Sequence, residues 1–219
     1  PAPVFAGDTL YWALHLYASS SWYPLSDRIS SGDAEVSYFF HAGLALVNGS
    51  SGRVSVVADS VLDPTAATWS ARFPRLFTTR EALAPEFVAQ FPPAIEGALA
   101  QAAAYARVGQ RGEVTVPSHL PTTSGGDSVM RAGEASLFVS PDADAPTWAI
   151  PILDSGDRVR GLIVAQGGVA PETRWAPIAV ASPRWPAIVD RLQHYPDETP
   201  APTGARLVRG RVRAIPMVD

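Results

Sequence analysis

Short apolar runs separated by turn-forming residues dominate this sequence, which carries 21 prolines and 17 glycines among its 219 residues. The clearest case joins residues 35–47 to residues 53–60 through Asn48, Gly49 and Gly52. Asparagine and glycine adopt positive φ readily, so this spacing predicts a β-hairpin. Runs this short are too brief for a bundle of long helices, and they favour strands accompanied by a few helices.

The remaining runs predict further elements. Asp63-Pro64 predicts a helix start, with Asp63 as the N-cap. A second helix is expected from Pro92 or Pro93 to Gly109, with Ile95 and Leu99 on its packed face, and a third over Trp185–His194. Further strands are expected at 9–18, 135–140, 147–153, 159–166, 178–181 and 206–218. The pattern predicts an α+β fold, with a mixed, mainly antiparallel sheet and a few packed helices.

The length fits one soluble domain over residues 1–219, either undivided or formed as two lobes at 1–109 and 135–219. The segment 110–134 contains Pro117, Pro121 and the run Thr122–Gly126, and it is expected to be the loop that joins the lobes. No apolar run reaches membrane-spanning length. Because the sequence starts at Pro1 without a signal-like segment, a processed chain or a piece of a larger one is expected.

Composition argues against several kinds of chemistry. The formal net charge is −4, which argues against binding to nucleic acid. All 17 basic residues are arginine, so neither a Schiff-base lysine nor a phosphate-loop lysine is possible. The chain has no cysteine, which excludes disulfides and thiolate zinc sites. No cofactor is predicted.

The four histidines are widely separated, at His15, His41, His119 and His194. None has the spacing of a metal-ligand pair, so no metal site is predicted. His15 and His41 lie inside apolar runs, and they are expected to be hydrogen-bonded residues of the core or of an interface.

One short motif suggests an enzymatic alternative. Gly126-Asp127-Ser128-Val129 is similar to the nucleophile block of GDSL-type serine hydrolases, with Asp190 and His194 as conceivable partners of Ser128. That family places its serine after a hydrophobic strand near the N-terminus and spaces its acid and base as DxxH. Here the serine follows a polar mid-chain segment and the spacing is one residue longer, so a loop is the more ordinary interpretation.

Aromatic and basic residues offer candidates for a protein interface. Tryptophan is frequent in interfaces, and six tryptophans are many for a chain of this size. The last predicted strand also carries a row of arginines that suits a carboxylate-rich partner or anionic headgroups. The interface candidates are Trp12, Trp22, Trp148, Trp175, Trp185, Arg206, Arg209, Arg211 and Arg213.

Four segments, in order, carry a family resemblance. They are LYWALHLYASSSWYPLSD, VNGSSGRVSVVADSVLDP, the stretch from WSARFPRLF to AAAYARV, and GARLVRGRVRAIPMVD. In this order they resemble the soluble region of the uncharacterised protein family UPF0182, whose members are large bacterial multi-pass membrane proteins. Positions of the third segment that match the family's pattern are Phe73, Pro74, Leu76, Phe77, Phe91, Pro92, Gln101 and Tyr105.

The resemblance implies a location rather than an activity. In that family the soluble region follows several transmembrane helices and is taken to lie outside the cytoplasmic membrane, and no catalytic residue is established. The resulting expectation is a non-enzymatic, extracytoplasmic domain of a membrane-associated protein. Its expected partner is a membrane protein or complex, which includes the remainder of its own parent chain.

Overall fold

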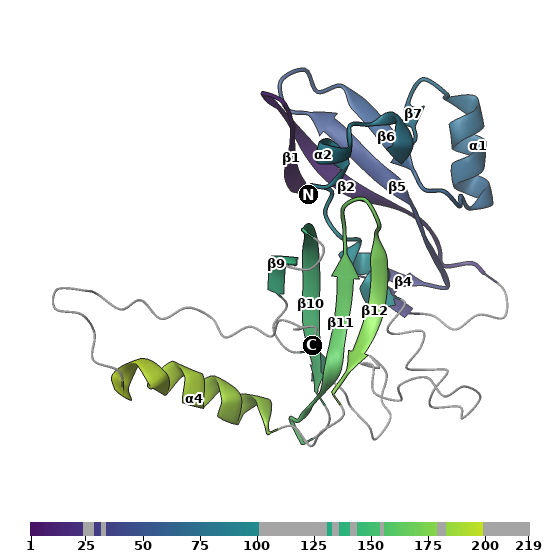
Figure 1. Ribbon diagram of the computed structural model, residues 1–219. Helices are drawn as coiled ribbons and strands as arrows, with labels where there is room; N and C mark the ends of the chain where they lie inside the picture. Colours follow the sequence, from purple (N-terminus) through teal and green to yellow (C-terminus); the bar gives the residue numbers. More distant parts are fainter. Residues whose placement is uncertain are drawn as a thin grey trace. The chain divides into compact units, whose positions relative to one another are not determined.

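The computed structural model describes residues 1–23, 29–31, 34–100, 131–132, 136–140, 144–153, 156–178 and 183–198. The chain divides into two compact units. Unit 1 contains Pro1–Ala104, Leu137–Trp148 and Ala165–Thr173, and unit 2 contains Tyr105–Ser136, Ala149–Val164 and Arg174–Asp219. Figure 1 shows the order of helices and strands, which confirms the predicted α+β fold.

Unit 1 is organised around a five-stranded sheet in the order β1-β2-β5-β6-β7. The strands are β1 (Ala2–Ala6), β2 (Thr9–Ser20), β5 (Tyr38–Asn48), β6 (Val54–Ala58) and β7 (Phe77–Thr78). All neighbours are antiparallel except β6 and β7. The predicted hairpin is confirmed as β5–β6, and the Asn48 side chain accepts hydrogen bonds from the backbone N–H groups of Ser50 and Ser51.

The core of unit 1 lies against one side of this sheet, which we call the inner face and define by Val4, Ala13, Leu44 and Leu46. The short helix α2 (Pro85–Val88) and the residues after it contribute Phe87, Val88 and Phe91 to the same cluster. These side chains are at most 6% exposed. Burial of this apolar surface holds the segment after α2 against the sheet.

A β-bulge interrupts the pairing of β2 with β5. Leu16 lies opposite Gly43 and Tyr17 lies opposite His41, so Ala42 is the extra residue. Side chains alternate along a strand, and one inserted residue therefore moves His41 to the face that carries His15 and Tyr17. Gly43 has φ 148, and a Cβ there would meet the Val57 carbonyl oxygen at 2.4 Å.

The helix α1 (Pro64–Arg72) begins as predicted, with the Asp63 side chain accepting from Ala66 N–H at 2.7 Å. The next predicted helix begins at Ile95 rather than at Pro92 or Pro93 and is described to Ala100. Its packed face also differs from the prediction, because Ala98 and Ala100 are buried whereas Leu99 is 37% exposed. A residue that precedes a proline disfavours the helical backbone conformation. Pro92 precedes Pro93, so the helix starts later than the sequence predicts.

The second sheet has the order β12-β11-β10-β8, with β9 paired to β10. Its strands are β8 (Arg131–Ala132), β9 (Ser136–Ser140), β10 (Ala145–Leu153), β11 (Val159–Gln166) and β12 (Glu172–Pro177). Of the strand expected at 178–181 only Ile178 is described, just after the end of β12, and the other three positions lie outside the described residues; β12 itself was not predicted. Among the described strands β12 pairs with β11 alone, and an edge strand tolerates a proline.

The other described elements are the pair β3 (Ile29–Ser31) and β4 (Ala34–Val36), the 3-10 turn η1 (Arg80–Ala82) and α4 (Trp185–Glu198). The helix α4 confirms the one predicted from Trp185. The strand expected at 206–218 and nearly all of the loop expected at 110–134 lie outside the described residues. None of the described helices combines the length and apolarity needed to cross a bilayer.

Candidate functional site

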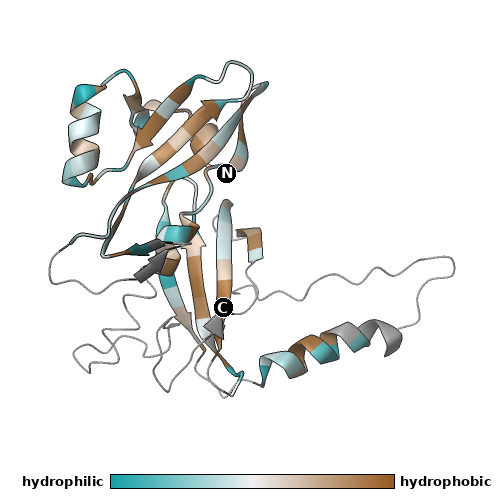
Figure 2. Ribbon diagram, turned by 180° about the vertical axis from the view of Figure 1, so that it is seen from behind, coloured by the Kyte–Doolittle hydropathy of each residue, from teal (hydrophilic) through white to brown (hydrophobic). Residues whose placement is uncertain are grey.

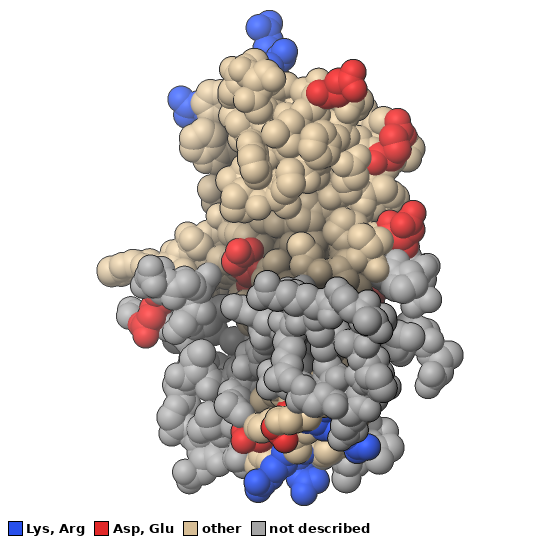
Figure 3. Space-filling view, turned by 90° about the vertical axis from the view of Figure 1, so that its left-hand side faces the viewer, with Lys and Arg blue, Asp and Glu red and all other residues tan. Residues whose placement is uncertain are grey.

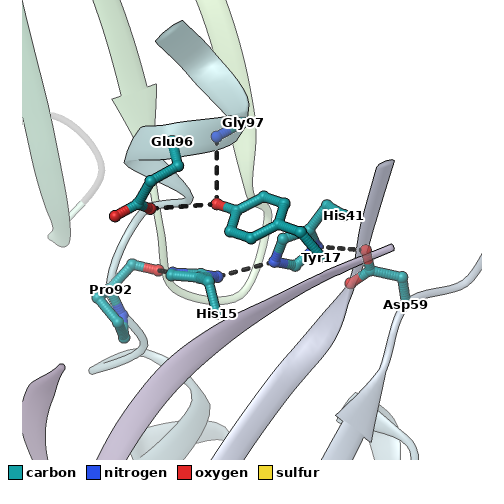
Figure 4. A network of polar contacts seen from close by, with 7 residues as sticks. All are labelled: His15, Tyr17, His41, Asp59, Pro92, Glu96 and Gly97. Carbon is teal, nitrogen blue, oxygen red and sulfur yellow. Dashed lines mark hydrogen bonds and ion pairs between the residues drawn. The ribbon is translucent and has the colours of Figure 1, made fainter. Parts of the chain in front are cut away.

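Two histidines and an aspartate form a continuous line of hydrogen bonds in unit 1 (Figure 4). Asp59 Oδ2 lies 2.5 Å from His41 Nδ1, and His41 Nε2 lies 2.8 Å from His15 Nδ1. His15 Nε2 contacts the carbonyl oxygen of Pro92 at 3.1 Å. We call His15, His41 and Asp59 the histidine chain. It connects β2, β5 and the end of β6 to the segment that follows α2.

Tyr17 provides a second connection to the same segment. Its hydroxyl accepts from Gly97 N–H at 3.1 Å and donates to Glu96 Oε2 at 3.3 Å. The Tyr17 ring stacks on Phe39 with centroids 4.5 Å apart and meets the His41 ring edge-on at 5.2 Å. The bulge makes this cluster possible, because His41 would otherwise face the opposite side of the sheet.

Burial controls the charge states around the histidine chain. Burial, with the neighbouring His41 as a second cause, lowers the pKa of His15 from 6.5 to about 4. Burial also raises the pKa of Tyr17 well above its ordinary value, so the phenol stays protonated. The pKa of the nearby Arg80 is lowered by burial while Asp59 opposes that change.

The geometry limits what the histidine chain can do chemically. The ring nitrogens of His15 and His41 point at each other, and the described residues hold no group of three His, Cys, Asp or Glu side chains suited to a metal ion. A nucleophile activated by histidine needs a hydroxyl or thiol at the end of the line. This line ends at a backbone carbonyl, which accepts a hydrogen bond and carries no reactive group. The arrangement is suited to holding a segment in place and to binding protons.

The opposite side of the unit 1 sheet exposes apolar side chains. Strand pairing aligns Pro3 with Trp12, Trp12 with Val47, and Val47 with Val54, so these residues form a row across four strands. We call this the outer face and define it by Phe5, Trp12, Leu16 and Val54, which are 52%, 42%, 38% and 43% exposed. An exposed apolar surface of this kind is typical of an interaction site.

Hydropathy and charge in this part of the chain can be followed in Figures 2 and 3. Hydrophobic bands cross the strands of the sheet that contains β1, β2 and β5 in Figure 2. On the side of the molecule drawn in Figure 3, the upper part carries acidic and basic side chains mainly at its margins, with an uncharged area between them. Low charge density suits the centre of a protein interface.

The tryptophans selected from the sequence have different environments. Trp12 lies on the outer face and Trp22 is 90% exposed, whereas Trp148 is buried, at 5% exposed. Trp175 is half-buried on β12, where its ring lies so close to Gly161 that a Cβ there would clash. Trp185 is half-buried at the start of α4, where its backbone N–H donates to the Asp157 carbonyl.

The other sequence candidates fall partly outside the described residues. Arg206, Arg209, Arg211 and Arg213 lie there, and so does Ser128. His194 and Asp190 lie on exposed α4, with Nδ1 and Oδ1 3.3 Å apart, a separation set by their positions one helical turn apart. Helix geometry alone accounts for this contact, so it gives no support to a catalytic role.

Sequence reasoning missed two features of unit 1. The histidine chain was missed because nothing in the sequence marks the bulge that brings His41 beside His15. The aromatic pair of Trp69, on α1, and Phe73, the residue that caps its C-terminal end, was also missed, although the two are four residues apart. Their rings stack at 5.2 Å, and the side chains are 54% and 42% exposed.

Comparison with known proteins gives a relationship to one family. A model of the Uncharacterised protein family (UPF0182) matches residues 1–92. A UPF0182 protein from a Nostoc species is 33% identical over 78 residues, which cover 35% of this chain and 8% of that protein. No solved structure matches the chain. The matched segment therefore contains the five-stranded sheet, the histidine chain and the outer face, and spans a small part of the relative.

Proposed function

Because the chain belongs to UPF0182 through residues 1–92, we propose that it acts as a non-enzymatic docking domain of a membrane-associated protein on the extracytoplasmic side. The occupant of its outer face is another part of a UPF0182 polypeptide, which would be the remainder of the parent chain or a membrane-bound homologue. The observation that carries the proposal is the exposure of apolar side chains on the outer face, above all Trp12 and Leu16.

Two further points support this choice of partner. In the Nostoc relative the matched residues make up 8% of the protein, so the corresponding module belongs to a much longer chain there. Domains of one long chain commonly form interfaces of about 600–1,500 Å² with neighbouring parts of that chain. The exposed part of the outer face lies mainly on β1, β2 and the start of β6, since Ala45 and Val56 on the same face are buried, and a stable interface needs about 800 Å² from each partner.

Site-specific photocrosslinking in native membranes tests the proposal. A benzophenone amino acid replaces Trp12 or Leu16, and the control position is Ser19, which is exposed on the same strand but on the opposite side of the sheet. We expect crosslinked peptides from a UPF0182 polypeptide at positions 12 and 16 and none at 19. Equal crosslinking at all three positions, or products from unrelated proteins only, would contradict docking through the outer face.

Location is tested separately. Protease added to intact spheroplasts should degrade the domain while it spares a cytoplasmic marker. Full protection of the domain until the membrane is disrupted would overturn the extracytoplasmic assignment, whatever the crosslinking result.

A further inference from the structure

The C-terminal end of α1 exposes two aromatic rings that the core of unit 1 does not use (Figure 1). Trp69 and Phe73 are 54% and 42% exposed, and their rings stack with centroids 5.2 Å apart. Neither side chain belongs to the buried cluster on the inner face. A pair of aromatic rings held together on the surface is typical of an interaction site.

The backbone holds these rings in place at the end of the helix. Phe73 caps α1 by donating its N–H to the Trp69 carbonyl at 2.9 Å, and Pro74 prevents the helix from continuing. Leu76 N–H then donates to the Phe73 carbonyl at 2.9 Å, which closes a turn over residues 73–76. Arg75 therefore lies in this turn, directly after the aromatic pair.

Arginine accompanies the two rings. The guanidinium carbon of Arg72 lies 5.8 Å from the centroid of the Phe73 ring, and both Arg72 and Arg75 are exposed. Neither arginine forms an ion pair with a carboxylate in the described part of the chain. We call Trp69, Arg72, Phe73 and Arg75 the aromatic tip. Its two cations are free to bind an anionic partner.

The aromatic tip is basic in a chain that is acidic as a whole. The formal net charge of the chain is −4, yet residues 64–80 include three arginines and no acidic residue. Asp63, just before this stretch, is buried as the cap of α1, and Glu81 follows it. A local cationic surface on an acidic chain attracts an anionic partner at that surface and orients the chain toward it.

The size of the aromatic tip decides between two kinds of partner. An aromatic side chain buries about 150–250 Å² when it is fully covered, so two half-exposed rings offer on the order of 200 Å². A stable protein interface needs about 800 Å² from each partner. A bilayer accepts individual aromatic rings at the depth of its headgroups, where arginines also pair with lipid phosphates. The aromatic tip therefore suits a lipid surface.

We infer that the aromatic tip is a contact site for an anionic lipid bilayer, with Trp69 and Phe73 entering the headgroup layer and Arg72 and Arg75 binding lipid phosphates. The site is separate from the outer face and needs no second protein. It rests on the proposed function in one respect, because a domain tethered beside a membrane has a high effective concentration there. A weak contact by four side chains is then enough to hold the domain against the bilayer.

Flotation of the whole chain with lipid vesicles tests this contact. The vesicles contain phosphatidylcholine with or without phosphatidylglycerol. We expect binding to the anionic vesicles that weakens at high salt, where charge attraction is screened, and that is much weaker on neutral vesicles. Each arginine near an anionic surface contributes about fivefold to affinity, so the double substitution Arg72→Gln and Arg75→Gln should weaken binding by about tenfold or more.

The aromatic contribution has its own variant and matched controls. Trp69→Ser with Phe73→Ser should also weaken vesicle binding by about tenfold or more, because it removes the apolar area that enters the headgroups. Trp22, which is 90% exposed, and Arg53, which is exposed on the β5–β6 turn, lie outside the aromatic tip. Trp22→Ser and Arg53→Gln should leave binding unchanged. No binding of the unaltered chain to anionic vesicles, or equal losses in these controls, would contradict the inference.

A fluorescent label locates the contact on the chain. The sequence has no cysteine, so an environment-sensitive fluorophore can be attached at a single chosen position. A label on Trp69→Cys should shift its emission to shorter wavelength on anionic vesicles, whereas a label on Trp22→Cys should not. An unchanged spectrum at position 69 while the chain floats would place the lipid contact elsewhere and overturn the inference.

These outcomes are distinct from those that test docking. The vesicles contain no protein, so their result does not depend on a UPF0182 polypeptide, and crosslinking at positions 12 and 16 does not depend on the aromatic tip. Absence of vesicle binding together with crosslinks from Phe73 to a protein in native membranes would assign the aromatic tip to a protein partner instead.

Discussion

Gly43 decides the geometry of unit 1 at the scale of a single residue. Its φ of 148 lies in a region that L-residues with a side chain rarely adopt, and it sits beside the bulge that turns His41 to the inner face. The neighbouring strand β6 passes so close that the Val57 carbonyl oxygen occupies the position of a Cβ. Both the angle and the close approach require glycine.

Gly43→Ala should therefore lower the free energy of unfolding by about 2 kcal/mol or more, from backbone strain and the clash with β6. Urea denaturation measures the change. Gly52→Ala is the matched control, because Gly52 also has positive φ, at 68, but has open space around its Cβ position. It should lose only about 1 kcal/mol. Equal losses would show that the clash with Val57 does not matter.

His15 should make stability depend on pH. Its pKa is about 4 in the folded chain and 6.5 when unfolded, so between these values the unfolded chain binds more protons. Acid then favours unfolding. The free energy of unfolding should fall as pH drops from 6.5 to 4, with a contribution from His15 on the order of 3 kcal/mol.

Denaturation at several pH values checks this contribution. His15→Gln should be less stable at pH 7, because it replaces a well-packed ring, but its stability should fall less between pH 6.5 and 4. Parallel curves for the two proteins over this range would mean that His15 titrates normally.

At the scale of secondary-structure elements, the edge strand β1 is completed by a side chain. The Gln90 amide accepts from Phe5 N–H and donates to the Phe5 carbonyl, each at 2.9 Å, which imitates the pairing of a neighbouring strand. An unpaired edge can recruit another chain, and Gln90 blocks part of this one. The contact also links β1 to the residues after α2.

Gln90→Ala should remove both contacts and lower the free energy of unfolding by about 1–2 kcal/mol. Amide exchange at Phe5 should become faster, whereas exchange in β5 should change only in proportion to global stability. Gln166→Ala is a suitable comparison, since the Gln166 amide makes a longer contact of 3.4 Å with the Ala170 carbonyl. An unaltered Phe5 exchange rate in Gln90→Ala would show that the edge does not depend on this side chain.

The elements that sequence reasoning predicted correctly are those governed by local chemistry. The β5–β6 hairpin follows from Asn48 and its glycines, and the start of α1 follows from Asp63 and Pro64. The strand β12 was not predicted because Glu172–Pro177 contains charged residues and a proline, which are tolerated in a sheet mainly at its edge. Local patterns do not show which strands lie at an edge.

The same distinction applies to the candidate sites. Exposed tryptophans such as Trp12 were found because composition alone draws attention to them. The outer face as a whole needed the register of four strands, and the histidine chain needed one bulge and the return of Pro92 to β2. His15 and Pro92 are 77 residues apart in sequence, so no motif could connect them.

At the scale of the whole molecule, the two units are not consecutive in sequence. Unit 1 takes Leu137–Trp148 and Ala165–Thr173 from the second half of the chain, in addition to its N-terminal portion. Within unit 1, Gly168 N–H donates to the Phe91 carbonyl, and Arg80 donates to the Gly168 carbonyl. The family match ends at residue 92, so it does not include the segments of unit 1 that come from the second half of the chain.

The outer face should control the association of the whole chain without controlling its folding. Trp12 and Leu16 are 42% and 38% exposed, so they stabilise the fold less than buried residues do. Per side chain, the double substitution Trp12→Ser and Leu16→Ser should lower the free energy of unfolding less than a substitution of a fully buried leucine does. It should also reduce self-association at high sulfate concentration, where apolar contacts strengthen.

Sedimentation and urea denaturation of the same samples measure both effects. Leu46→Ser is the contrasting substitution, because Leu46 is 2% exposed on the inner face and pairs with Ala13. Removing that side chain and burying a hydroxyl should cost about 3 kcal/mol or more. If the outer-face double variant were destabilised as much as Leu46→Ser, the outer face would belong to the core of unit 1. Its exposed tryptophan and leucine would then be part of the fold rather than a surface kept for a partner.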